Sequence, residues 1–136
     1  MPGWSVGLIE PLPIMPQQGR GKVIGGRKQL EAYSTPRDYL RTLRTSAYQG
    51  ETGWIPEDFL SHFIAQLKTT SQVSHDRYDS NALWLLGSYM PNSMPKAQLV
   101  PTGYWTRDGG RLHLTAHRAG NRLRRWVARS TVRLAA

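Results

Sequence analysis

Arginine and aromatic side chains are concentrated in the last third of the chain. Guanidinium groups bind phosphate oxygens through paired hydrogen bonds, and aromatic rings stack on unpaired bases. The two side-chain types together predict a surface that binds nucleic acid. The residues assigned to phosphate are Arg107, Arg111, Arg118, Arg122, Arg124, Arg125, Arg129 and Arg133, and those assigned to stacking are Tyr104, Trp105 and Trp126. Trp126 takes this role only if its strand does not direct it into the core.

The charge of the chain is distributed unevenly. From Lys96 onward there are nine lysines and arginines against the single acid Asp108, so this segment supplies eight of the nine net positive charges. Residues 1–95 are therefore close to neutral. A pI near 10.5 favours a polyanionic partner, with nucleic acid first and an anionic membrane surface second.

A second group of cations lies in the glycine-rich segment 19–28. A nucleotide-binding P-loop requires Gly-Lys-Ser/Thr after the first glycine and four further residues. Here Gly26-Arg27-Lys28 stands at that place, without a hydroxyl residue. The segment is interpreted as a flexible basic loop that makes a secondary contact with a phosphate chain. Its cations are Arg20, Lys22, Arg27 and Lys28.

Two histidines, His113 and His117, are the candidates for catalysis or metal binding. They would face one metal ion on a helix, but the hairpin signal around them predicts a strand, and no Asp or Glu lies nearby as a third ligand. A metal-independent ribonuclease is the sharper hypothesis, with His113 or His117 as general base and Arg111 and Tyr104 in support. The preferred interpretation is that both are ordinary surface histidines, with no catalytic residue, metal or cofactor.

Length and composition limit the remaining possibilities. A chain of 136 residues is expected to form one domain with one core. The absence of cysteine excludes disulfides, thiolate metal sites and cysteine nucleophiles. The longest apolar run, Ala82 to Leu86, is far shorter than a membrane span. We expect a soluble intracellular protein without a transmembrane segment.

The arginines are expected on a hairpin and a final strand. Residues 103–107 and 111–115 flank Asp108-Gly109-Gly110, which supplies the positive φ angles of a tight hairpin turn. A second turn is expected at 119–121. Residues 122–134 alternate as a half-buried strand does, although arginines 122, 125, 129 and 133 also align on one side of a helix. Strand is favoured by Val, Thr and Trp, and either structure places the guanidinium groups on one face.

Two helices are expected before this region. The first runs from Pro36 to Gln49 and is capped by Thr35. The second begins at Pro56, and its apolar stripe is predicted to be core, with His62 exposed or at the edge of the helix. The stripe consists of Phe59, Leu60, Phe63, Ile64 and Leu67. Residues 69–80 are predicted to form a mobile loop, 81–90 a buried strand and 97–100 a further strand.

The first 18 residues carry four prolines and are predicted to form an extended arm. Its apolar residues indicate that it lies on a surface, either as an edge strand of its own sheet or on a partner. The predicted organisation is an extended arm and basic Gly-rich loop over residues 1–28, followed by a single α+β domain over 29–136.

The sequence thus predicts an α+β protein in which two amphipathic helices pack on a small antiparallel sheet. The predicted function is non-enzymatic nucleic-acid binding, with RNA preferred to DNA. In composition the chain resembles small nucleoprotein components of viruses, phages and ribosomes, which implies a role in a nucleoprotein assembly. The alternative is an assembly subunit whose arm and basic face dock on an acidic protein partner, and the ribonuclease comes third.

Overall fold

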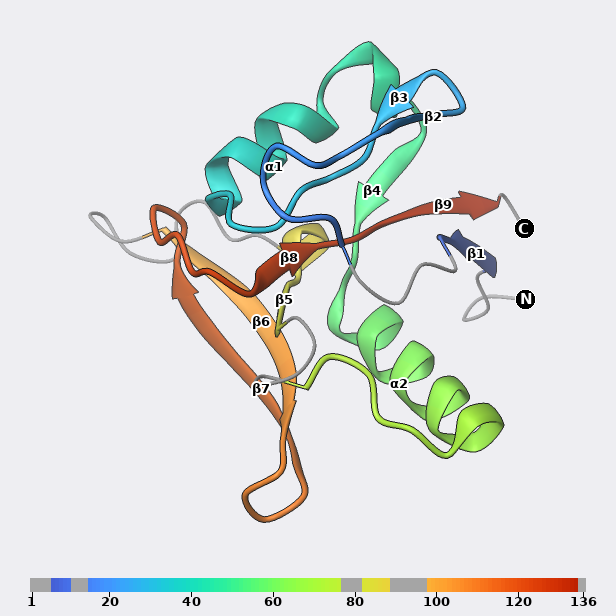
Figure 1. The fold of residues 1–136 in the computed structure, drawn as a ribbon, viewed down its shortest axis with the longest axis vertical. Helices are drawn as coiled ribbons and strands as arrows, with labels where there is room; N and C mark the ends of the chain where they lie inside the picture. The colour runs from blue at the N-terminus through green and yellow to red at the C-terminus, as the bar shows by residue number, and fades with distance from the viewer. Residues whose placement is uncertain (1–5, 11–14, 77–81, 89–97, 135–136) are drawn as a thin grey trace.

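The computed structural model describes residues 6–10, 15–76, 82–88 and 98–134. It is an α+β fold with two α-helices and three sheets, and it contains more sheet than helix (Figure 1). The elements in chain order are β1 (Val6–Ile9), β2 (Val23–Ile24), β3 (Arg27–Lys28), α1 (Pro36–Leu43), η1 (Ser46–Tyr48), β4 (Glu51–Gly53), α2 (Pro56–Thr70), β5 (Ala82–Trp84), η2 (Leu86–Ser88), β6 (Leu99–Thr106), β7 (Arg111–Arg118), β8 (Trp126–Ala128) and β9 (Ser130–Leu134).

The strands form three sheets where the sequence predicted one. The four-stranded sheet has the order β7-β6-β5-β8, in which β5 and β8 run parallel. The three-stranded sheet has the order β1-β9-β4 and is antiparallel, and β2 and β3 form a separate small hairpin. The prediction of one antiparallel sheet is therefore corrected, because the last segment of the chain contributes to two sheets.

Residues 126–134 pass from one sheet to the other at Arg129. The residues before it form β8 in the four-stranded sheet, and those after it form β9 in the three-stranded sheet. Figure 1 shows this crossing in red near the centre of the molecule. The strand prediction for this segment is confirmed from Trp126 onward, whereas residues 122–125 form a connection outside the strands.

The expected hairpin and edge strand are both present. Strands β6 and β7 pair antiparallel around the turn at residues 107–110, in which Gly109 and Gly110 have positive φ angles. In the arm, Val6 to Ile9 form β1 and pair with β9, which confirms the edge-strand alternative for these residues. Residues 1–5 and 11–14 of the arm lie outside the described part of the chain.

Helix α1 begins as predicted but ends earlier. The side chain of Thr35 accepts a hydrogen bond from the Asp38 amide at 3.2 Å, as a helix cap does. The helix ends at Leu43, and a 3₁₀ turn follows at residues 46–48. The hydroxyls of Thr42 and Thr45 donate to backbone carbonyls within this segment, a local alternative to continued helix that the apolar periodicity did not reveal.

Helix α2 packs on β6 through one close contact. A Cβ atom on Gly103 would lie 2.7 Å from the Phe59 ring, so only glycine allows the ring to approach the strand this closely. Phe59 and Phe63 are buried, whereas Ile64 and Leu67 are 49% and 40% exposed. The prediction that the whole apolar stripe is core is therefore wrong at these two positions, because the sheet covers only one side of the helix.

The segment after α2 is anchored, contrary to the expectation of a mobile loop. Helix α2 continues to Thr70, and Ser71 ends it in the left-handed conformation. Residues 74–76 are buried, and the carbonyl of His75 accepts a hydrogen bond from the Trp105 amide at 3.0 Å. Residues 77–80 lie outside the described part of the chain. Of the predicted strand 81–90, residues 82–84 are a buried strand; 81, 89 and 90 are not described.

His62 was expected to be exposed or at the helix edge; it is partly exposed, and its ring contacts the core. Its ring centroid lies 5.1 Å from that of Trp54 and 5.7 Å from that of His75. Its Nδ1 atom is buried and has no hydrogen-bond partner among the described residues. Burial, together with the positive charge of Arg129, lowers the pKa of His62.

This environment predicts a loss of stability in mild acid. The folded protein holds His62 below its unfolded pKa of 6.5, so the unfolded state takes up the proton first as the pH falls. The free energy of unfolding should decrease below about pH 6.5 and level off only below the folded pKa. Urea denaturation from pH 7.5 to 5.5 measures the effect. His62→Gln should show a smaller decrease; an equal decrease would assign the effect to other titratable groups.

The sheets approach each other where β4 meets η2. A Cβ atom on Gly87 would lie 2.3 Å from the carbonyl oxygen of Gly53, and one on Gly53 would lie 2.6 Å from Cβ of Leu86. The amide of Gly87 also donates to the carbonyl of Trp54 at 3.0 Å. The two backbones are therefore in direct contact, and neither position has room for a side chain.

We expect Gly87→Ala to lower the free energy of unfolding by about 1 to 3 kcal/mol, because the methyl group overpacks this contact. Gly120→Ala is the matched control, since the nearest atom to its added Cβ lies 3.8 Å away. The control should change stability by less than about 0.5 kcal/mol. Thermal and urea denaturation compare the two variants, and equal effects would contradict the close approach.

Candidate nucleic-acid interface

The two faces of the β6–β7 hairpin carry different side chains. Directly paired residues share a face. One face, here called the histidine face, carries the pairs Val100/His117, Thr102/Thr115, Tyr104/His113 and Thr106/Arg111. The other, the leucine face, carries Pro101/Ala116, Gly103/Leu114 and Trp105/Leu112, and α2 packs on its Gly103. The expected site residues of the hairpin are therefore divided between two surfaces.

The histidine face holds an ordered group of rings. The rings of Tyr104 and His113 are stacked, with centroids 5.0 Å apart and planes 14° apart. Nε2 of His113 lies 3.0 Å from the hydroxyl of Thr106, and Nδ1 of His117 lies 3.2 Å from the hydroxyl of Thr102. The hydroxyls fix the orientation of both imidazoles. Tyr104, His113 and His117 are each partly exposed.

Trp126 lies beneath these rings and is only 7% exposed. Its centroid is 4.8 Å from those of Trp84 and His117. A ring enclosed in this way has no open face for a base, so Trp126 serves the core. The half-exposed Trp105 lies on the leucine face, and Tyr104 is the stacking candidate on the histidine face.

The exposed arginines gather at the end of β7 and in the connection that follows it. Arg118, Arg122, Arg124 and Arg125 are all exposed. Arg37 joins them, because its amide donates to the carbonyl of Ala119 at 3.4 Å and its guanidinium lies beside Gly120. We call these residues, Arg37, Arg118, Arg122, Arg124 and Arg125, the arginine cluster. Figure 1 shows the first turn of α1 beside this connection.

Contacts within the cluster connect it to α1. The guanidinium of Arg122 lies over the ring of Tyr33, 5.4 Å from its centroid. A hydrogen bond from Thr35, with the charges of Arg41 and Arg122, lowers the pKa of Asp38. Within the described part of the chain, Arg37, Arg118, Arg122 and Arg124 form no ion pair. Their charge is therefore available to an external anion.

The other predicted arginines lie elsewhere. Arg111 is exposed at the far end of the hairpin, and Arg107 beside it is paired with the buried Asp76 at 3.1 Å. Arg133 is paired with Asp58 at 2.6 Å. Arg129 is 2% exposed and lies at the strand crossing. The expectation that all guanidinium groups share one face therefore fails at Arg129 and Arg133, because the crossing redirects the strand.

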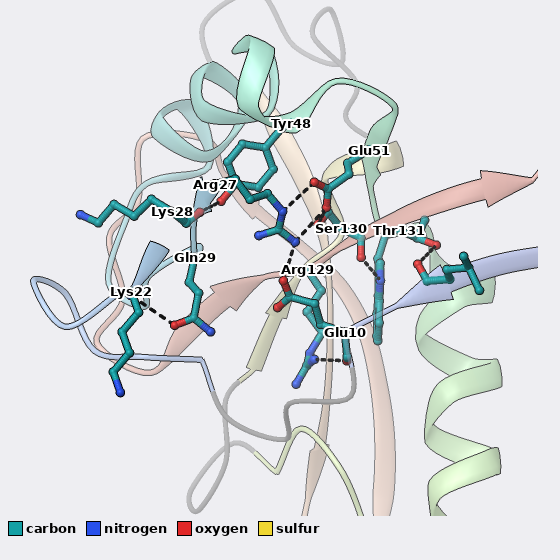
Figure 2. Close-up of polar contacts among 12 residues, drawn as sticks. Glu10, Lys22, Arg27, Lys28, Gln29, Tyr48, Glu51, Arg129, Ser130 and Thr131 are labelled. Atoms are coloured by element: carbon teal, nitrogen blue, oxygen red, sulfur yellow. Dashed lines mark hydrogen bonds and ion pairs between the residues drawn. The ribbon is translucent and has the colours of Figure 1, made fainter. Parts of the chain in front are cut away.

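Arg129 belongs to a buried polar network around a small cavity (Figure 2). Its Nη1 donates to the carbonyl of Glu10 at 3.4 Å, and its guanidinium lies 5.6 Å from the Trp54 ring centroid. Burial lowers the pKa of Arg129 to about 10, so that it stays charged at neutral pH. Above it, Arg27 bridges the carboxylates of Glu10 and Glu51.

The basic segment 19–28 is held in place by contacts with other residues of the protein. Residues 23–24 and 27–28 pair as a hairpin, and Arg27 is held between carboxylates and over the ring of Tyr48. The amides of Gly19 and Gly21 donate to the Glu31 carboxylate at 2.7 and 3.1 Å, and Lys28 reaches it at 2.8 Å. These donors lower the pKa of Glu31, the bond from Lys28 most of all. Arg20 and Lys22 remain exposed cations here.

The histidines do not form a paired catalytic site. Residues four apart in a strand are separated by about 13 Å, too far for both to contact one phosphate. His113 lies with Tyr104 and Arg111 on the histidine face, whereas His117 lies nearer the arginine cluster. The described residues contain no group of three His, Asp or Glu side chains placed to hold a metal ion. No helix in the described ranges is long and apolar enough to cross a membrane.

We expect different roles for Arg129 and Arg124, although both were predicted from the sequence to bind phosphate. Arg129→Ala should lower the free energy of unfolding by about 2 to 4 kcal/mol, because it leaves a cavity in the buried network. Arg124→Ala should leave stability unchanged within about 0.5 kcal/mol, because the side chain is exposed. Urea denaturation of both variants measures the difference. An unchanged stability of Arg129→Ala would contradict the structural role.

Comparisons of the chain with models of known protein families, with curated proteins and with solved structures give no match.

Proposed function

We propose that this protein binds the phosphate backbone of nucleic acid through the arginine cluster, without catalysis, and that RNA is its preferred partner. The single observation that supports this is the exposure of four arginines in a segment of the sequence that contains no acid. After Asp108 the sequence contains no Asp or Glu, and Arg118, Arg122, Arg124 and Arg125 are all exposed there. A group of exposed guanidiniums attracts a polyanion and binds its phosphates bidentately.

The distribution of ion pairs supports the same proposal. Many of the described acids are paired with cations outside the cluster: Glu10 and Glu51 with Arg27, Glu31 with Lys28, Asp38 with Arg41, Asp58 with Arg133 and Asp76 with Arg107. The segment after Asp108 contains no acid of its own. A patch of this kind steers a polyanion toward one side of the molecule.

The preference for RNA rests on the histidine face. In this proposal the four-stranded sheet, with α2 on its leucine face, presents Tyr104 and His113 to an unpaired base while the cluster holds the adjoining phosphates. Stacking on aromatic rings is the usual way in which proteins bind single-stranded RNA. A role inside the cell, as a component of a nucleoprotein assembly, agrees with this mode of binding.

Charge reversal of the cluster tests the proposal. The variant Arg37→Glu/Arg122→Glu/Arg124→Glu should reduce the affinity for single-stranded RNA at least about 100-fold and lower the slope of log affinity against log salt by about 2. The matched control Arg41→Glu/Arg44→Glu/Lys68→Glu makes the same change in net charge at exposed cations outside the cluster and outside the basic loop. Fluorescence anisotropy across a salt series measures both variants.

Equal losses in the two variants would indicate diffuse attraction without a site and contradict the proposal. A wild-type slope near zero, with tight binding to an acidic protein, would favour the docking function instead. The wild-type samples should also be checked for RNA cleavage in EDTA. Cleavage that disappears in His113→Gln would favour the ribonuclease hypothesis over simple binding.

A further inference from the structure

Strand β7 is an edge strand, and solvent reaches its outer edge and both of its faces. It lies at one end of the sheet order β7-β6-β5-β8, and no strand in the described ranges pairs with its outer side. Six of its eight residues are exposed and the other two are partly exposed. Leu112 and Leu114 are among the exposed large apolar residues. A long, accessible edge of this kind is a template for another strand.

The pairing of β6 shows which backbone groups of β7 point to the outer edge of the sheet. The carbonyl of Pro101 accepts from the Leu85 amide at 2.8 Å, and the amide of Trp105 donates to His75 at 3.0 Å. These residues of β6 therefore direct their backbone groups away from β7. Hydrogen-bonded and non-hydrogen-bonded pairs alternate in an antiparallel ladder. The residues opposite 101, 103 and 105, which are Ala116, Leu114 and Leu112, consequently direct their N–H and C=O groups to the outer edge.

The middle of β7 lacks the devices that normally protect an edge. Proteins block edges with Lys, Pro, bulges or inward-pointing charges. Residues 112–117 contain no Lys, Arg, Asp, Glu or Pro, and the pairing with β6 runs without a bulge from residue 111 to 118. The middle of the edge, residues 112–117, is therefore competent to pair with another strand.

We propose that β7 pairs with β7 of a second copy of the chain, antiparallel, about a two-fold axis at Leu114. Two conditions restrict the register: the paired residues must have outward backbone groups, and the two leucine faces must lie on the same side. Among the registers that meet both, the one centred on Leu114 is chosen because it pairs seven residues of each strand and keeps both arginines of the strand away from the leucines. Leu114 then opposes its own equivalent, Leu112 opposes Ala116 of the second copy, and the two four-stranded sheets become one continuous sheet. The proposal is independent of nucleic-acid binding.

The side chains of this register complement each other. Apolar residues meet apolar residues on the leucine face, which joins the exposed Leu112 and Leu114 of both copies into one strip. On the histidine face Arg111 lies opposite His117 of the second copy, so no arginine faces another arginine. An acidic strand fits less well, because the central positions 112–117 offer no cation to its carboxylates.

Edge-blocking substitutions test the dimer in samples freed of nucleic acid. Sedimentation equilibrium should show a concentration-dependent dimer for the wild type. Leu114→Lys places a charge at the two-fold axis, and Ala116→Pro removes an outward N–H without affecting the pairing with β6. Each should weaken dimerisation at least about tenfold. The control Leu134→Lys changes a strand leucine of matched exposure, 48% against 52% for Leu114, and should dimerise as the wild type does.

Cysteine cross-linking tests the register, and the absence of native cysteine makes it unambiguous. In Leu114→Cys the two Cα atoms should lie about 5.5 Å apart, within reach of a disulfide. In Leu112→Cys they should lie about 14 Å apart, beyond reach. We expect a covalent dimer on mild oxidation of the first variant and not of the second.

Three results would overturn the proposal. They are a wild-type monomer up to the solubility limit, equal cross-linking of the two cysteine variants, and a dimer unaffected by Leu114→Lys. If the monomer instead binds a strand-forming peptide of alternating Glu and Val, the occupant of the edge is an acidic partner. Because no nucleic acid is present in these measurements, their outcome is separate from that of the charge-reversal experiment.

Discussion

The buried charge of Arg129 is the constraint on which the other parts of the structure depend. The chain changes sheets at this residue, so its side chain lies between them, against the Trp54 ring and the Glu10 carbonyl. A guanidinium in that position requires polar surroundings. Glu10 and Glu51, with Arg27 between them, provide these surroundings and connect the arm, the β2–β3 hairpin and β4. Ser130 completes the network through Glu51, and its carbonyl accepts from the Trp54 indole at 3.1 Å.

This network also determines which charges reach the surface. It holds Arg129 in the interior and pairs Arg27 with Glu10 and Glu51, two of the nine acids. Glu31, Asp38, Asp58 and Asp76 form further ion pairs with Lys28, Arg41, Arg133 and Arg107. Arginines are the only charged residues in the connection between β7 and β8, and no acid in that segment neutralises them. The charge of the exposed positive surface therefore comes from the arginines of this connection, while the ion pairs lie elsewhere in the fold.

Local signals in the sequence predicted local structure well. Asp108-Gly109-Gly110 indicated the hairpin, Thr35 and Pro36 the start of α1, and the alternation after Trp126 a strand. The failures involve contacts between distant segments. Periodicity shows which residues alternate but not that a strand leaves one sheet for another, so Arg129 was assigned to the surface. Arg37 was not among the predicted site residues, because only the folded chain brings it to Ala119. The contact of His62 with Trp54 was not predicted for the same reason, since Trp54 lies outside its helix.

The pairing of β1 with β9 has a consequence for the order of folding. Val6 pairs with Leu134 and Ile9 with Thr131, so the contacts of this sheet close almost the entire chain into one loop. Loop closure over such a separation has to be completed before those contacts contribute free energy, and folding slows as contact order rises. During synthesis β1 has no partner strand until the last segment leaves the ribosome. The β6–β7 hairpin, whose contacts are local, can form earlier, and the three-stranded sheet is then the last part of the fold to assemble.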